Sequence, residues 1–79
     1  MARVTEFEKL EKERHPMHDV ARCTYSVFKS PEGEQLFQLD TYGSRGRQFP
    51  DKISQSIQLD EKAATRLVQL LKQTFPTLR

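Results

Sequence analysis

Two histidines and one cysteine come nearest to a metal-binding set in this sequence. His15, His18 and Cys23 follow an H-x2-H-x4-C spacing. Structural zinc sites use four ligands, usually supplied as two close pairs, so this spacing does not match them. We therefore interpret both histidines as exposed side chains and Cys23 as a small buried thiol on a strand, and we expect no bound metal.

Side chains for nucleophilic or acid–base catalysis show no recognisable arrangement. Asp40 and Asp51 fall in different predicted elements, and no trio of Ser, His and Asp follows a local spacing. The Gly-Ser-Arg-Gly-Arg stretch at 43–47 lacks the Lys-Ser/Thr end of a P-loop, and no helix follows it directly. The sequence therefore indicates a binding protein without a cofactor rather than an enzyme.

The densest cluster of cations and aromatic rings lies at residues 42–52, of which we name 43–52 the basic loop. Its cations can pair with phosphates, and each ring that stacks on a base can contribute roughly 1–3 kcal/mol. The same residues also fit a loop whose arginines only keep it soluble while Phe49 tucks beneath it, and residue chemistry favours the two interpretations equally. The cluster comprises Tyr42, Arg45, Arg47, Phe49 and Lys52.

Alternation of apolar and polar residues predicts three strands, at 20–29, 35–42 and 53–59. Turn residues at 30–33 join the first two strands as a hairpin. The side chains expected to point inward are Ala21, Cys23, Tyr25, Val27, Phe37, Leu39, Thr41, Ile53, Ile57 and Leu59. The outward face is polar and nearly uncharged, which suits contact with a polymer or a partner, and it carries Arg22, Thr24, Ser26, Gln38, Ser54, Ser56 and Gln58.

Two helices are predicted, one at each end of the chain. Thr5 and Glu8 form a capping box that predicts a short helix to about Arg14, before Pro16. Asp60 is a good N-cap for a longer amphipathic helix at 61–75. Its apolar stripe consists of Ala64, Leu67, Val68, Leu71 and Phe75. We expect this stripe to cover the sheet and to meet a second copy of the chain.

Length and composition bound the possible classes. With 79 residues, 35% of them hydrophobic, the chain has room for one thin core, so dimerisation is a reasonable expectation. Residues 1–19 are assigned to the N-terminal helix and linker, and 20–79 to a single binding domain. A single cysteine, no signal peptide and no long apolar run predict a cytoplasmic protein without a membrane segment.

From Leu36 onward the chain resembles the PC4-like (transcriptional coactivator p15) family of single-stranded DNA-binding proteins. The resemblance rests on a strand, Asp40-Thr41-Tyr42, the basic Gly/Pro loop, the stretch 53–60 (ISQSIQLD) and a long amphipathic helix. It implies a bent sheet with one C-terminal helix, a homodimer formed through the helices, and DNA bound by strands and basic loops. The residues that it implies for helix packing are Leu67, Leu70, Leu71 and Phe75.

The stretches 15–44 and 52–56 also resemble short bacterial proteins that carry the name methionyl-tRNA formyltransferase. Transfer of a formyl group to a charged tRNA needs a folate-binding α/β domain, which is longer than roughly a hundred residues. The chain has neither this length nor a βαβ pattern.

Together these observations predict an α+β domain: a short N-terminal helix, a three- to four-stranded antiparallel sheet and one C-terminal helix packed on it. We expect it to bind single-stranded DNA or RNA, with a possible accessory role in transcription or DNA metabolism. The alternative is a protein-interaction module that docks a partner protein. The residues expected to contact nucleic acid are Arg22, Tyr42, Arg45, Arg47, Phe49, Lys52, Ser54 and Ser56.

Overall fold

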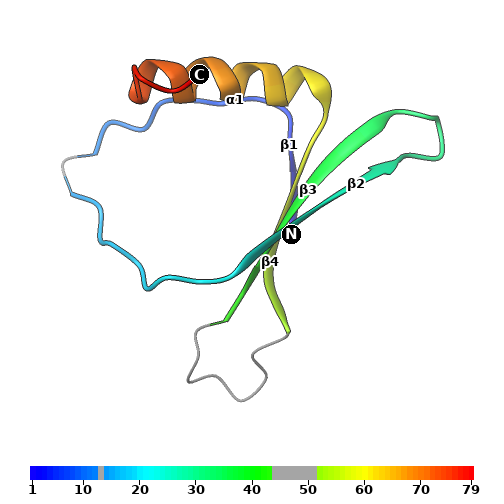
Figure 1. The fold of residues 1–79 in the computed structure, drawn as a ribbon, viewed down its shortest axis with the longest axis horizontal. Helices are drawn as coiled ribbons and strands as arrows, with labels where there is room; N and C mark the ends of the chain where they lie inside the picture. The colour runs from blue at the N-terminus through cyan, green and yellow to red at the C-terminus, as the bar shows by residue number, and fades with distance from the viewer. Residues whose placement is uncertain (13, 44–51) are drawn as a thin grey trace.

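The described part of the chain forms one four-stranded sheet with one helix at its end. The computed structural model describes residues 1–12, 14–43 and 52–79. Its strands are β1 (Ala2–Val4), β2 (Cys23–Lys29), β3 (Gln35–Tyr42) and β4 (Ile53–Leu59), in the order β1-β4-β3-β2, and the helix is α1 (Glu61–Thr74). The predicted α+β class with one C-terminal helix is confirmed, and Figure 1 shows α1 across one end of the twisted sheet.

Strands β2 and β3 form the predicted hairpin. Ser30 accepts a hydrogen bond at its carbonyl from the Gly33 amide (2.9 Å), and its own amide donates to the Glu34 carbonyl (2.8 Å). Gly33 has a φ of 86°, a left-handed conformation that costs a residue with a side chain about 1–2 kcal/mol. The turn chemistry of residues 30–33 therefore sets the register of the two strands.

The register sorts the side chains into two faces, largely as predicted. Tyr25 lies opposite Leu39, which in turn lies opposite Ile57. We call the first face the apolar sheet face after the side chains that dominate it: Val4, Tyr25, Val27, Phe37, Leu39, Ile57 and Leu59. The register places polar residues on the same side towards its ends, namely Lys29, Gln35, Thr41 and Gln55. We call the second the polar sheet face after Arg3, Thr24, Ser26, Gln38, Asp40, Ser56 and Gln58. Next to the hairpin turn this face also carries the apolar pair Phe28 and Leu36.

A register shift corrects the predicted faces at the start of β4. Thr41 pairs with Gln55, but Tyr42 pairs with Ile53, so Ser54 is an extra residue on β4. A bulge of this kind interrupts the strict alternation of a strand. Ile53, predicted to point inward beside Ile57, therefore sits opposite Tyr42 on the polar side.

The N-terminal segment differs from the prediction of a helix. Ala2–Val4 forms β1, which pairs in parallel with β4 and makes the sheet mixed rather than wholly antiparallel. Residues 5–12 and 14 are not helical. Helices shorter than about 12–15 residues are marginal in water without packing, and only Phe7 and Leu10 offer an apolar contact here. Leu10 is 71% exposed, so the capping box has no surface to stabilise a helix.

Helix α1 begins and ends close to the predicted residues. The Asp60 carboxylate accepts a hydrogen bond from the Ala63 amide (2.8 Å), and Lys72 lies in the last turn. Phe75 is the C-cap, with its amide donating to the Leu71 carbonyl (2.8 Å). Leu67 and Leu70 are half-buried, whereas Leu71 and Phe75 are exposed. The apolar stripe of α1 is therefore only partly buried.

The core is small, and its buried apolar side chains come from β3, β4 and α1. Among the described residues, only Leu36, Leu59 and Ala63 are buried apolar side chains. Cys23, predicted to be buried, is exposed, because β2 is an edge strand whose apolar side is left uncovered by residues 1–12, 14–43 and 52–79. Much of the apolar sheet face is consequently open to solvent.

Candidate nucleic-acid interface

A ladder of hydrogen-bonded polar side chains, two glutamines, a serine and the carboxylate of Asp40, runs across the centre of the polar sheet face. The Gln58 amide Nε2 donates to Gln38 Oε1 (2.8 Å), and Gln38 Nε2 donates to Asp40 Oδ1 (2.9 Å). Ser56 Oγ donates to the same Asp40 oxygen. Asp40 and Ser56 are 8% and 7% exposed, so this network fixes the central side chains of the face. It holds the amide groups of both glutamines in defined orientations.

An arginine and a tyrosine pack together at the end of the sheet from which the basic loop leaves. The Arg22 guanidinium lies 4.3 Å from the centre of the Tyr42 ring. The Tyr42 hydroxyl is 3.0 Å from Thr24 Oγ1, and the Tyr42 amide donates to the Arg22 carbonyl (3.1 Å). Arginine is attracted to the face of an aromatic ring. These contacts hold a cation and a ring together at the edge of the polar sheet face.

A shallow hollow lies beside the ladder. Its volume is about 310 Å³. A hollow of this size with several hydrogen-bonding groups can hold part of a flat polar ligand. The residues that line it are Met1, Ala2, Arg3, Gln38, Ile53, Ser56 and Gln58.

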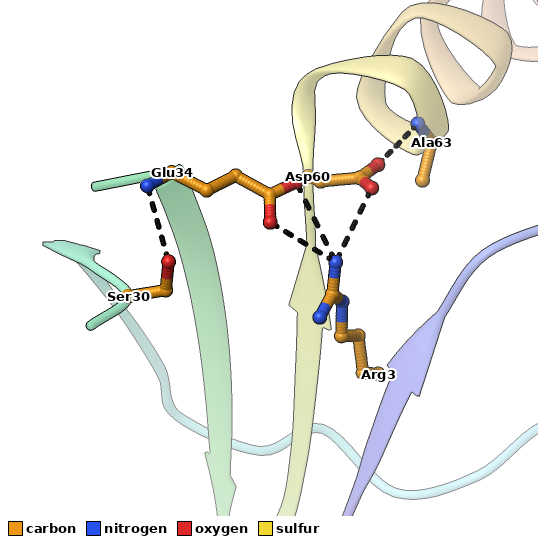
Figure 2. A network of polar contacts seen from close by, with 5 residues as sticks. All are labelled: Arg3, Ser30, Glu34, Asp60 and Ala63. Atoms are coloured by element: carbon orange, nitrogen blue, oxygen red, sulfur yellow. Dashed lines mark hydrogen bonds and ion pairs between the residues drawn. The ribbon is translucent and has the colours of Figure 1, made fainter. Parts of the chain in front are cut away.

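At the opposite end of the sheet, Arg3 is paired with two carboxylates of the same protomer. Figure 2 shows Arg3 of β1 between two acidic side chains, with Nη2 at 3.3 Å from Glu34 Oε2 and 3.6 Å from Asp60 Oδ2. Ser30 Oγ accepts a hydrogen bond from the Glu34 amide (3.1 Å). The hydrogen bond from the Ala63 amide, assisted by Arg3, lowers the pKa of Asp60. The charge of Arg3 is therefore already compensated by these two carboxylates and is less available to an anionic ligand.

The structure brings together some of the predicted contact residues. Arg22, Tyr42 and Ser56 lie on or beside the polar sheet face. Lys52 and Ser54 are exposed at the start of β4, at the same end as Arg22 and Tyr42. The other three predicted residues, Arg45, Arg47 and Phe49, lie outside the described residues.

Sequence reasoning missed two features of this surface. It gave no role to Arg3, because the three-residue strand Ala2–Val4 has no alternation long enough to reveal a partner. It also gave Asp40 no role on this face, although the carboxylate is buried and accepts two hydrogen bonds. The position of Asp40 directly opposite Ser56 becomes visible only once the register of β3 and β4 is known.

Other kinds of site find little support in the part of the chain that the structure describes. No group of three or more His, Cys, Asp or Glu side chains within it is placed to hold a metal ion. No helix in these ranges has the length and apolar character needed to cross a bilayer.

Comparison of the chain with protein-family models, with curated proteins and with solved structures finds no match.

Proposed function

We propose that the chain binds single-stranded DNA or RNA across the polar sheet face, with no catalytic step. The observation that carries this proposal is the Arg22–Tyr42 pair at the end of the glutamine and serine ladder. A cation beside a ring can contact a phosphate while the ring or the guanidinium plane stacks on a base. The glutamine amides next to it can donate to and accept from base edges.

Electrostatics favours one end of the face for the phosphates. Arg3 is already paired with Glu34 and Asp60, and the buried Asp40 carboxylate would repel a phosphate placed over the centre of the ladder. Lys52 is exposed at the other end, and the sequence adds Arg45 and Arg47 to the basic loop there. We therefore propose that the backbone of the nucleic acid runs past Arg22, Lys52 and the basic loop, with its bases over the glutamines.

The net charge of +2 favours contacts with a few phosphates rather than a large electrostatic footprint. Binding of this kind has little sequence preference, because stacking and phosphate contacts are available to every nucleotide. An accessory role in transcription or DNA metabolism in the cytoplasm would suit such an activity.

Fluorescence anisotropy with a labelled oligo-dT at two salt concentrations tests the proposal. Each phosphate contact that is lost lowers the slope of log K against log salt by roughly 0.7. We expect Lys52→Ala to weaken binding at low salt and to reduce this slope. Arg66→Ala, which removes an exposed cation from α1, is the matched control and should leave binding unchanged.

Variants at Tyr42 distinguish the contribution of ring stacking to binding from the contribution of charge. We expect Tyr42→Ala to weaken binding with an unchanged salt slope, because stacking releases no counterions. Tyr42→Phe keeps the ring and loses only the contact with Thr24, so it should bind nearly as well as the wild type. Absence of oligonucleotide binding by the wild-type protein at low salt would refute the proposal and favour a protein-interaction module.

A further inference from the structure

The hollow beside the ladder combines one apolar wall with several hydrogen-bonding groups. The bulge at Ser54 brings Ile53 to the polar side, where its side chain is 40% exposed and lines the hollow. Gln38, Ser56 and Gln58 line it as well. The volume of about 310 Å³ is at the lower end of the roughly 300–1,000 Å³ of small-molecule sites, which suits one flat ring rather than several.

The carboxylate of Asp40 fixes the direction in which the amides of the ladder point. A carboxylate only accepts hydrogen bonds, so Gln38 turns its NH2 group towards Asp40. Gln38 thereby presents its carbonyl oxygen to Gln58, which donates to it through Nε2. Gln58 Oε1 is therefore left as an acceptor at the end of the ladder nearest β1, and no described residue donates to it.

Arg3 adds hydrogen-bond donors beside this acceptor. It is the register partner of Gln58 on β1, and it also lines the hollow. Its contacts with Glu34 and Asp60 all run through Nη2, as Figure 2 shows. Nε and Nη1 of Arg3 keep N–H groups that no described residue accepts. Because the two carboxylates compensate the charge of the guanidinium, an uncharged ligand suits these donors better than a phosphate does.

These groups present the order donor, acceptor, donor to a ligand in the hollow. Arg3 supplies the first donor, Gln58 Oε1 is the acceptor, and the second N–H of the Gln58 amide is the other donor. The complementary ligand edge has the order acceptor, donor, acceptor. Thymine and uracil have this edge, because N3–H lies between two carbonyl oxygens, whereas the Watson–Crick edges of cytosine, adenine and guanine have other orders. Unpaired bases expose these edges and are commonly recognised through them.

We propose that the hollow is a subsite for one thymine or uracil of the bound strand. This inference rests on the proposed function, because the strand must bring the base to the polar sheet face. The N3–H and the two carbonyl oxygens of the base pair with Gln58 and Arg3, and the face of its ring packs against Ile53. The preference concerns one nucleotide, and the neighbouring nucleotides are bound without regard to sequence.

Anisotropy titrations of the full chain with three short labelled strands test the proposal. Oligo-dT and oligo-dC have the same backbone and rings of the same size, and they differ in the order of donors and acceptors. A strand of N3-methylthymine keeps the ring and both carbonyl oxygens but lacks the N3–H donor. We expect oligo-dT to bind about tenfold more tightly than either of the other strands, since good paired hydrogen bonds to a base discriminate by at least about this much.

The same titrations distinguish failure of the subsite from failure of the proposed function. Equal binding of all three strands would overturn the subsite and leave single-strand binding intact. Absence of binding by all three would refute the proposed function, and the subsite with it.

Two glutamines on β4 provide a matched pair of variants. Gln58 lies on the polar sheet face, whereas Gln55 is exposed on the opposite side of the same strand. We expect Gln58→Ala to make the affinities for oligo-dT and oligo-dC nearly equal, and Gln55→Ala to keep the wild-type ratio. The ratio is the readout, because a loss of stability or of phosphate contacts weakens both complexes alike.

An unchanged ratio in Gln58→Ala, or an equal fall in both variants, would overturn the assignment of the base to the hollow. If Gln58→Ala does not fold, the N3-methylthymine strand still tests the same hydrogen bonds in the wild-type protein.

Discussion

Replacement of Leu59 by alanine should test whether the small core determines the stability of the fold. Leu59 is the last residue of β4 and only 5% exposed. The change removes three buried carbon atoms, worth about 2.4 kcal/mol at roughly 0.8 kcal/mol each. The cavity left behind adds to this loss, so we expect a total of about 2–4 kcal/mol. A domain of 79 residues has a free energy of unfolding of roughly 4–12 kcal/mol, so the loss is a large fraction of it.

Urea unfolding followed by circular dichroism measures this loss. At about 4–8 °C per kcal/mol for a domain of this size, the thermal midpoint should also fall by roughly 8–32 °C. Leu71→Ala removes the same atoms from a side chain that is 37% exposed, and it is the matched control. We expect it to cost no more than about half as much. A loss below about 1 kcal/mol for Leu59→Ala, or a loss equal to that of Leu71→Ala, would contradict our description of the core.

Three further predictions concern the turn, the thiol and the helix cap. Gly33→Ala should destabilise the protein by about 1 kcal/mol in urea unfolding because of the positive φ, whereas Glu32→Ala in the same turn should be nearly neutral. Cys23 should react quickly with a thiol reagent in dilute native protein, and slow labelling that denaturant accelerates would mean that the strand edge is covered. Asp60 has a lowered pKa in the folded state, so its contribution is present above its unfolded pKa of about 3.9 and is lost as the pH falls through the folded value. Asp60→Asn keeps a good N-cap and should flatten the dependence of the thermal midpoint on pH in that acidic range, and an unchanged profile would show that the carboxylate does not titrate differently on folding.

The sequence predicted correctly those strands and helices that are determined by residues close together in the chain. The alternation at 35–42 and 53–59 gave β3 and β4, and the N-cap at Asp60 with the apolar stripe gave α1. Prediction failed where distant residues decide the conformation. Ala2–Val4 becomes a strand only because β4 offers an edge, and residues 5–12 lack the packing surface that a short helix requires.

The candidate site was predictable in part for the same reason. The polar residues at alternate positions identified the face, but only the pairing of β3 with β4 sets Ser56 opposite Asp40. The bulge at Ser54 moved Ile53 to the polar side, and no residue in the sequence marks that shift. The alternation of apolar and polar residues also predicts on which face of the sheet a side chain lies, but it does not predict whether another element covers that face. Cys23 and Tyr25 therefore have the expected side but not the expected burial.

The pairing of β1 with β4 has a consequence for the order of folding. Ala2 lies beside Ile57, so the strand that is synthesised first contacts a strand that is synthesised nearly last. The hairpin of β2 and β3 needs only a short loop and can form early. Strand β1 can pair only after β4 has formed, and this pairing closes a loop of most of the chain, which costs conformational entropy. Until β1 pairs, the edge of β4 has no neighbouring strand, and Glu34 and Asp60 lack their ion pairs with Arg3. We expect amide exchange at Ala2–Val4 to be faster than in the hairpin, with β1 the first element to detach when the protein begins to unfold.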